Sequence, residues 1–254
     1  MNTIGMKSLL VKEVRRFMRV PGQTVLSPLI STSLYFLVFG YSLAGRGAHA
    51  VEGVPYLSFI VPGLVFLGLA NNAFLNSSSS LFITKIQGTV VDLLVAPLGP
   101  LELMAGFIGG AMVRGLLVGG LTWLVASFFT GFHLEHAPAT LLFLLLSSYT
   151  FSMLGVLAAV WAEKFEQVNF FPTFVMLPLT FLGGVFYSVR ELPTPWNHVS
   201  LFNPIVYMVE GLRYGMLGKS GFSPVWGGTI LLGVALVATG LAWAALRSGY
   251  KLKA

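Results

Sequence analysis

Near the C-terminal end, between two long apolar runs, residues Thr180 to Phe222 read TFLGGVFYSVRELPTPWNHVSLFNPIVYMVEGLRYGMLGKSGF. Within this stretch, Asn203 and Pro204 begin a helical pattern and Gly218 follows its end, which are common helix boundaries. About 14 residues at 1.5 Å each extend roughly 21 Å, less than the roughly 30 Å of a hydrocarbon core. We therefore expect residues 188–224 to form an outer region with a short re-entrant or surface helix.

This short helix has two different faces. At about 100° per residue its polar side chains gather on one side, which carries Tyr207, Glu210, Arg213 and Tyr214. We expect that side to contact water or a partner and the other to contact apolar groups. Glu210 and Arg213 are interpreted as fixing the helix rather than binding substrate.

Three motifs stand in the same stretch: GGVFYS at 183–188, a turn with Pro193, Pro195 and Trp196, and NPIVYMVEGLRYGMLG at 203–218. Together they resemble the C-terminal signature of ABC-2 membrane subunits. These are the membrane halves of ATP-binding-cassette exporters of drugs, glycolipids and polysaccharides, including the nodulation-factor and daunorubicin exporter permeases. The resemblance extends along the whole chain in length and in the order of spans, and it does not specify a substrate.

Composition indicates an integral membrane protein. The 254 residues are 56% hydrophobic and only 9% charged, with a mean hydropathy of +0.83, whereas soluble domains are about 25% charged. The net charge of +6 comes from cations beside apolar runs, which favours membrane topology over nucleic-acid binding. Cysteine is absent, so disulfides and thiolate chemistry are excluded. Residues 1–20 are charged throughout, and no cleavable signal peptide is expected.

The apolar runs predict an all-α protein with six spans. Their approximate bounds are 25–44, 56–84, 102–131, 139–161, 168–187 and 225–246. Ten Lys and Arg residues fall on one side of these spans, and four on the other: Arg46, Arg190, Arg213 and Lys219. The expected location is the inner or plasma membrane. The positive-inside rule then predicts that both termini lie in the cytoplasm.

Residues 4–20 predict an amphipathic helix along the membrane surface. Its apolar face carries Leu10, Val14, Phe17 and Met18, and its basic face carries Lys12, Arg15, Arg16 and Arg19. One interpretation is a basic anchor for anionic lipid. The resemblance implies another, a connecting helix that packs on the ATPase.

Residues 85–101 form a predicted cytoplasmic loop with a short helix near Asp92. The sequence DLLVAPLGPLEL at 92–103 resembles the coupling segment of ABC-2 permeases, which inserts into a groove of the ATPase. An ordinary intracellular loop would carry more charge, and exposed leucines would form an apolar patch awaiting a partner. The residues expected to contact the ATPase are Asp92, Leu93, Leu94, Pro97, Arg15 and Arg16.

Two spans carry candidates for a translocation path. The second span has a polar face with Gly68, Asn72, Asn76, Ser79 and Ser80, which must meet protein or water. The fifth span has a stripe of Phe170, Phe174, Leu177 and Phe181 and is interrupted by Pro172 and Pro178. Helix packing or lipid contact would explain both patterns as well. The path prediction names Asn72, Asn76, Phe170, Phe174 and Phe181.

Arg114 lies deep in the third span, where a charge suggests function by default. Snorkelling or pairing with a helix carbonyl would make it structural, which we favour. His133, Glu135 and His136 are adjacent in a short loop and are interpreted as a solvated turn, not a metal site.

The chain lacks the motifs of several enzyme classes. Gly218-Lys219-Ser220 would need a Gly where Arg213 stands to end a phosphate-binding loop. No metalloprotease or esterase motif and no intramembrane pair of carboxylates is present, which argues against a protease, an esterase and a proton-coupled carrier. No catalytic residue, metal or cofactor is expected in this chain.

These observations predict a permease subunit that pairs with a second copy of itself or with a close relative. They also predict two cytosolic ATPase subunits as partners, which hold ATP and Mg²⁺. By resemblance, the path lies between the two permeases near spans two and five. An ATP-independent transporter or channel is the alternative. A membrane-embedded lipid-modifying enzyme is a third class, disfavoured because no nucleophile and base are placed together.

Overall fold

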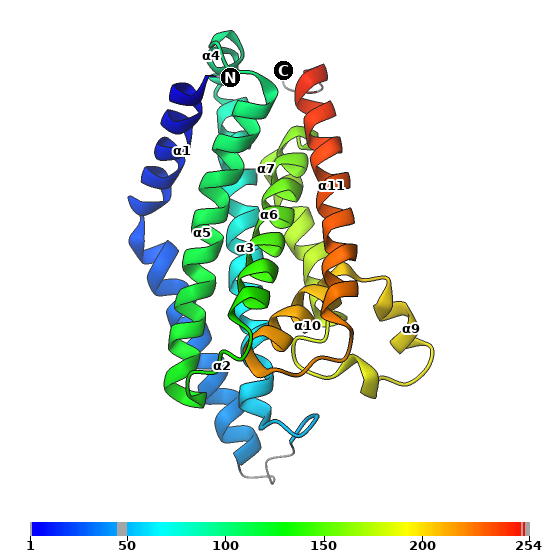
Figure 1. Cartoon of the computed structure of the whole chain (residues 1–254). Helices are drawn as coiled ribbons and strands as arrows, with labels where there is room; N and C mark the ends of the chain where they lie inside the picture. The colour runs from blue at the N-terminus through cyan, green and yellow to red at the C-terminus, as the bar shows by residue number, and fades with distance from the viewer. Residues whose placement is uncertain (1, 45–49, 250, 252–254) are drawn as a thin grey trace.

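The computed structural model describes residues 2–44, 50–249 and 251, without the side chains of residues 39–44, 93 and 94. It is a bundle of long helices around α3, Tyr56–Ile86 (Figure 1). Both α5, Pro100–Thr130, and α6, Ala137–Trp161, pack along α3, and α11, Pro224–Ser248, packs on α6. Most of α3 is therefore buried inside the bundle, including the serine-rich half.

Four helices in the described part of the chain are long and apolar enough to cross a membrane: α3, α5, α6 and α11. Their bounds agree with the predicted spans to within two residues at each end. They are consistent with the predicted all-helical membrane protein, because a helix satisfies its backbone N–H and C=O groups by hydrogen bonds within the segment.

The other two predicted spans are less regular. Residues 25–44 fall in a π-helical turn η1, Gly22–Leu26, followed by α2, Ser27–Ala44. Residues 168–187 fall in α7, Phe165–Phe170, then the π-helix η2, Phe171–Met176, then α8, Leu177–Phe181. Because proline donates no backbone hydrogen bond, Pro172 and Pro178 explain the break in regular α-helix. The count of six spans stays a prediction.

The two ends of the bundle differ in content. The first turn of α1, the short α4, Val90–Val95, and the last turn of α11 lie at one end (Figure 1). The segment before α3 and the short helices η3, Val189–Glu191, and α9, Trp196–Leu201, lie toward the other end. Chain ends on the same side fit an even number of crossings.

Helix α1, Thr3–Met18, packs lengthwise along α5 (Figure 1). Its predicted position along the membrane surface stays a prediction. Its buried residues are Leu9, Glu13 and Phe17, so the inward face is rotated from the predicted one and Met18 is exposed. Glycines of α5 permit this contact. A Cβ atom at Gly110 would lie 2.4 Å from the Cβ of Glu13, closer than any side chain tolerates.

Helix α10, Pro204–Leu217, begins and ends at the predicted caps. The Asn203 side chain accepts a hydrogen bond of 3.0 Å from the Ile205 backbone N–H, and Gly218 has a φ of +69°. The polar side was expected to contact water or a partner, and water is not its contact at Glu210 and Arg213, which are 4% and 1% exposed. Gly211 fits against Phe143 and Gly215 against Thr140, so α6 covers α10 closely.

Candidate functional site: a cleft between α2, α3, α5 and α8

A cleft of about 670 Å³ lies along α2 and α3. Apolar and aromatic side chains form most of its wall, and amides and hydroxyls interrupt them. The lining residues are Ser27, Pro28, Ser31, Thr32, Tyr35, Leu64, Leu67, Gly68, Asn71, Asn72, Thr122, Leu177, Thr180, Phe181, Phe186 and Tyr187. A mostly apolar wall with a few polar groups suits an amphipathic ligand.

The structure brings together only part of the predicted path. Asn72 and Phe181 both line the cleft. Asn76 is fully buried on α3 and is outside the cleft lining. Phe170 and Phe174 stack on each other with ring centroids 4.9 Å apart, and both are exposed on the bundle surface.

Sequence analysis missed the part of the cleft wall that the first predicted span supplies. Ser27, Ser31 and Thr32 of α2 recur at helical spacing and contribute hydroxyls to the cleft. Thr122 of α5 and Thr180 of α8 add two more. The serine and threonine spacing in α2 was the available signal, because hydroxyls on one face of a membrane span favour a polar contact.

Asn76 takes part in a buried polar junction between α1 and α3. An Arg16 Nη donates to the backbone O and the Oδ1 of Asn76, at 3.0 and 2.9 Å. The Arg16 Nε donates to Glu13 Oε2 at 3.2 Å, and Glu13 is completely buried. Arg16, predicted to contact an ATPase, is thus directed into the bundle.

Arg114 lies midway along α5 beside this junction. In the described part of the chain it forms no hydrogen bond and no ion pair, and its Nε is buried. The carbonyl pairing considered for Arg114 is therefore not observed.

The end of the bundle that carries α4 shows how α1 is attached there. Asn2 Nδ2 donates to the Pro97 backbone O at 3.2 Å, and the Asn2 backbone N–H donates to Glu102 Oε1 at 3.2 Å. Asp92 and Arg15 are both exposed, on α4 and α1. The side chains of Leu93 and Leu94, also named in the prediction, lie outside the described ones.

A separate ionic contact secures the turn between α6 and α7. Lys251 Nζ donates to Glu163 Oε1 at 2.5 Å, and this lowers the pKa of the exposed Glu163 carboxyl. Lys85 Nζ donates to the backbone O atoms of Val160 and Ala162, at 3.0 and 2.7 Å. These donors satisfy carbonyls that the end of α6 leaves open.

A second buried polar cluster, which we call the α10 cluster, contains Glu210 and Arg213. The two side chains form an ion pair, and an Arg213 Nη also donates to the Gly184 backbone O at 2.9 Å. Glu210 Oε2 accepts from the backbone N–H of Gly221 at 2.5 Å. The Arg213 guanidinium lies 3.8 Å from the centroid of the Phe59 ring. One helix is thereby joined to three other segments.

The tyrosines of α10 are also engaged. Tyr207 is buried, and its hydroxyl donates to the Leu201 backbone O at 2.9 Å. Tyr214 stacks on the His136 ring with centroids 4.5 Å apart. Both contacts are internal, so the predicted polar face is used within the fold.

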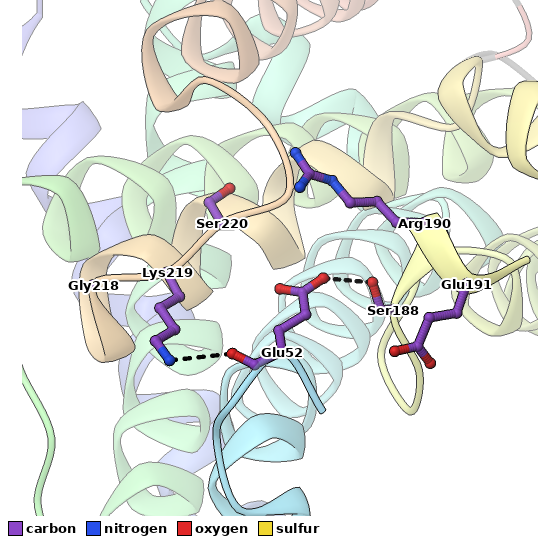
Figure 2. Close-up of a pocket in the computed structure, with 7 residues that line it drawn as sticks. All are labelled: Glu52, Ser188, Arg190, Glu191, Gly218, Lys219 and Ser220. Carbon is purple, nitrogen blue, oxygen red and sulfur yellow. Dashed lines mark hydrogen bonds between the residues drawn. The ribbon is translucent and has the colours of Figure 1, made fainter. Parts of the chain in front are cut away.

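A pocket of about 490 Å³ lies beside the end of α10 (Figure 2). It is lined by Glu52, Ser188, Arg190, Glu191, Gly218, Lys219 and Ser220. Glu52 lies in its centre, where its Oε1 accepts from Ser188 Oγ at 2.6 Å and its backbone O accepts from Lys219 Nζ at 3.1 Å. Two acidic and two basic residues balance its charge.

Buried acids are more numerous than the sequence suggested. Glu13 and Glu210 are both buried within the helical bundle, and each is paired with an arginine three residues later in its own helix. Among the described residues no group of three or more His, Asp or Glu side chains is arranged to hold a metal ion.

Comparisons with known proteins agree with these features. The chain is 43% identical over 215 residues to the inner membrane transport permease YadH of Escherichia coli (strain K12), covering 85% of this chain and 84% of that protein. It is 26% identical over 192 residues to Nodulation protein J of Sinorhizobium fredii, covering 75% and 72% of the two chains. The model of the ABC-2 type transporter family matches residues 5–217, which extend from α1 through α10. The motifs near the C-terminus resemble the same family. The chain therefore belongs to the ABC-2 type transporter family.

Proposed function

We propose that this chain is the permease subunit of an ATP-driven exporter that moves an amphipathic drug, lipid or glycan-type molecule out across the membrane. The observation that carries this proposal is the cleft of about 670 Å³ along α2 and α3, with mixed apolar and polar walls. Membership of a transporter family and similarity to an inner membrane transport permease support it.

The energy source in this proposal is a separate ATPase, present in two copies, which binds ATP and Mg²⁺. Its contact is the end of the bundle with α4, where Val91 and Val95 are exposed by 51% and 80% beside Asp92. An apolar patch on a short protruding helix is a typical docking surface. The first turn of α1 extends this surface through the contact of Asn2 with Pro97.

A second copy of the chain completes the path. Phe170 and Phe174 form an exposed aromatic surface on α7 and η2, near the α8 wall of the cleft. We assign six spans, both termini in the cytoplasm and the inner or plasma membrane as location. Residues 188–224, with α10 held by the α10 cluster, then lie at the outer end of the path.

The proposed mechanism is a shift between inward-open and outward-open arrangements. Nucleotide binding closes the ATPases and moves the segment from Asp92 to Leu101 together with α1. The two arrangements bind nucleotide differently, and this difference in affinity drives the change in population.

The test is copurification. The tagged chain is expressed from its native locus, purified in mild detergent and analysed by mass spectrometry, and an ATP-binding-cassette subunit is expected at about one to one. Asp92→Arg and Val95→Glu should release that subunit, since a buried unpaired charge at an interface costs about 2–5 kcal/mol. Glu135→Arg, an equally exposed acid at the opposite end of the bundle, should retain it.

Recovery of a stable chain without any ATPase, in every detergent and salt condition, would refute the proposal and favour an ATP-independent transporter. Equal retention in all three variants would refute the assigned docking surface. Product formation from lipid by the pure chain in liposomes would instead indicate a membrane enzyme.

A further inference from the structure

The wall of the cleft between α2, α3, α5 and α8 is polar in places but carries no charge. Among the described residues that line it there is no Asp, Glu, Lys, Arg or His. Its polar side chains are hydroxyls and amides, namely Ser27, Ser31, Thr32, Tyr35, Asn71, Asn72, Thr122, Thr180 and Tyr187. A molecule in the cleft therefore meets dipoles and aromatic rings, and a charged molecule would meet no counter-charge.

The cleft also lies far from the ends of the helices that form it. Along α3 it extends from Leu64 to Asn72, which are 8 residues after the first and 14 residues before the last residue of that helix. Helix α3 is long and apolar enough to cross a membrane. The cleft then lies at the depth of the hydrocarbon core, where a charge without a counter-charge is unfavourable.

Several polar side chains of the wall have no hydrogen-bond partner within the described part of the chain. Thr122 is 2% exposed, and its Oγ1 is buried without a partner. It lies directly against the wall at Gly68, because a Cβ atom there would be 2.8 Å from the Thr122 Oγ1. The same holds for five further lining side chains, those of Ser27, Ser31, Thr32, Asn71 and Thr180.

Hydroxyls elsewhere on α3 are satisfied by their own helix. Ser77 Oγ donates to the Ala73 backbone O at 3.2 Å. Thr84 Oγ1 donates to the Ser80 backbone O at 2.8 Å. Such bonds satisfy a hydroxyl within a membrane span. The six unpaired side chains of the cleft wall lack them, so their donors and acceptors are open to a bound molecule.

Open hydroxyls and amides select a particular kind of headgroup. Each of them both donates and accepts hydrogen bonds, and so does a hydroxyl or amide on a ligand. A carboxylate or phosphate mainly accepts, and a quaternary ammonium does neither. Aromatic rings in the wall attract cations, but without a carboxylate this attraction does not offset the lost hydration of a charge. Complementarity therefore favours an uncharged headgroup.

We propose that the cleft selects an amphiphile with an uncharged headgroup that carries hydroxyl or amide groups, and that it excludes anionic and cationic amphiphiles. The headgroup bonds to Asn71, Thr122 and the hydroxyls of α2, and the apolar part lies against Leu64, Leu67 and Phe181. The inference rests on the proposed export function and specifies its substrate class.

The first measurement is photolabelling of the purified full-length chain in phosphatidylcholine nanodiscs. The three probes share one diazirine-bearing alkyl chain and differ in the headgroup, which is a glucoside, a sulfate or a trimethylammonium. Mass spectrometry maps the labelled peptides, and labelling of the exposed side of α11 at Leu236 and Val237 corrects for partitioning into the bilayer. We expect the glucoside to label the cleft peptides of α3 and α8 about tenfold more than either charged probe.

A charge placed in the cleft should reverse this preference. Asn71→Asp supplies the missing counter-charge, so the trimethylammonium probe should gain about tenfold over the glucoside. Damage to the fold would instead lower the labelling by all three probes. Asn197→Asp is the matched control, because Asn197 lies on α9 outside the cleft lining, and it should leave the preference unchanged.

Loss of one hydroxyl should have a smaller and selective effect. Thr122→Val keeps the shape of the side chain and should lower glucoside labelling about fivefold, the effect of one hydrogen bond, without changing the labelling by the charged probes. Thr229→Val is the control, since the Thr229 hydroxyl donates to the Trp226 backbone O within α11. Equal labelling of the cleft by the three probes, stronger labelling by a charged probe, or an unchanged preference in Asn71→Asp would overturn the inference.

The second measurement distinguishes an exported molecule from a resident lipid. Proteoliposomes with the chain and its copurified ATPase should move the glucoside to the other leaflet only with ATP, and should not move the charged probes. Labelling without movement would identify a resident lipid and overturn the inference. ATP-driven movement of a charged probe would refute the uncharged class and leave the export function intact, whereas absence of an ATPase partner refutes the export function itself.

Discussion

Two groups of charged side chains in this bundle differ in how completely their hydrogen bonds and charges are paired. In the α10 cluster, Arg213 pairs with Glu210, donates to the Gly184 backbone O and lies over Phe59, and only its Nε lacks an acceptor. At the α1–α3–α5 junction, Arg114 has no partner in the described part of the chain, and Glu13 pairs with Arg16. The paired α10 cluster joins several segments of the fold, whereas Arg114 adds no hydrogen bond or ion pair in the described part of the chain.

Removing one partner of the ion pair in the α10 cluster should have the largest effect on stability. Glu210→Gln leaves Arg213 buried without its counter-charge, and breaking such a pair costs about 3–5 kcal/mol. We expect a large fall in the yield of monodisperse protein and in its thermal midpoint, measured by size-exclusion chromatography and heating in detergent.

The matched control for that change removes both charges. The double variant Glu210→Leu and Arg213→Leu leaves no buried charge unpaired, so it should recover part of the lost stability. If the single and double variants were equally unstable, packing around α10 rather than the ion pair would account for the loss.

A substitution at the contact between α1 and α5 should have a smaller effect on stability. Gly110→Val on α5 forces Glu13 and α1 away from the bundle, and overpacking of this kind costs about 1–3 kcal/mol. Trypsin should then cleave faster after Lys12 and Arg15 in α1. Gly120→Val is the control, because no atom lies within 4 Å of a Cβ at Gly120. Equal cleavage of both variants would contradict the assigned packing of α1.

Loss of the exposed ion pair between Glu163 and Lys251 should have the smallest effect on stability. Since Lys251 lowers the pKa of Glu163, the contact stabilises the fold at neutral pH and is lost as the pH falls through that lowered pKa. Proteolysis at the C-terminal end of α11 should therefore increase at acid pH in the wild-type chain. Glu163→Gln should flatten this pH profile and Glu166→Gln should not.

Local signals in the sequence predicted the boundaries of α10 but not its burial. Asn203, Pro204 and Gly218 act within one turn of the helix ends, so the sequence alone predicts them. Burial depends on which helix packs against Gly211 and Gly215, and Phe143 and Thr140 come from a distant part of the chain. A polar stripe on a helix therefore predicts a polar contact, and the structure decides whether water or protein supplies it.

The inward face of α1 shows the same limit. A hydrophobic pattern excludes a glutamate from the buried side, yet Glu13 is completely buried because Arg16, three residues later, pairs with it. In the cleft, Asn72 and Phe181 were predicted from helical stripes. Phe170 precedes the π-helix η2, Phe174 lies within it and Phe181 follows it. The wider turn of η2 rotates the stripe away from α-helical register.

Helix α1 is fastened near both of its ends. Asn2 bonds to Pro97 and Glu102 beside α4, and Arg16 bonds to Asn76 in the middle of α3. About 14 residues of helix separate these points, a rigid rod of roughly 21 Å. A rod attached at two places transmits displacement along its length, so a push at the α4 end would reach Asn76 without any rearrangement of α5. Arg16, which bonds α1 to α3, would then pass that displacement to the helix that carries Asn72 of the cleft wall.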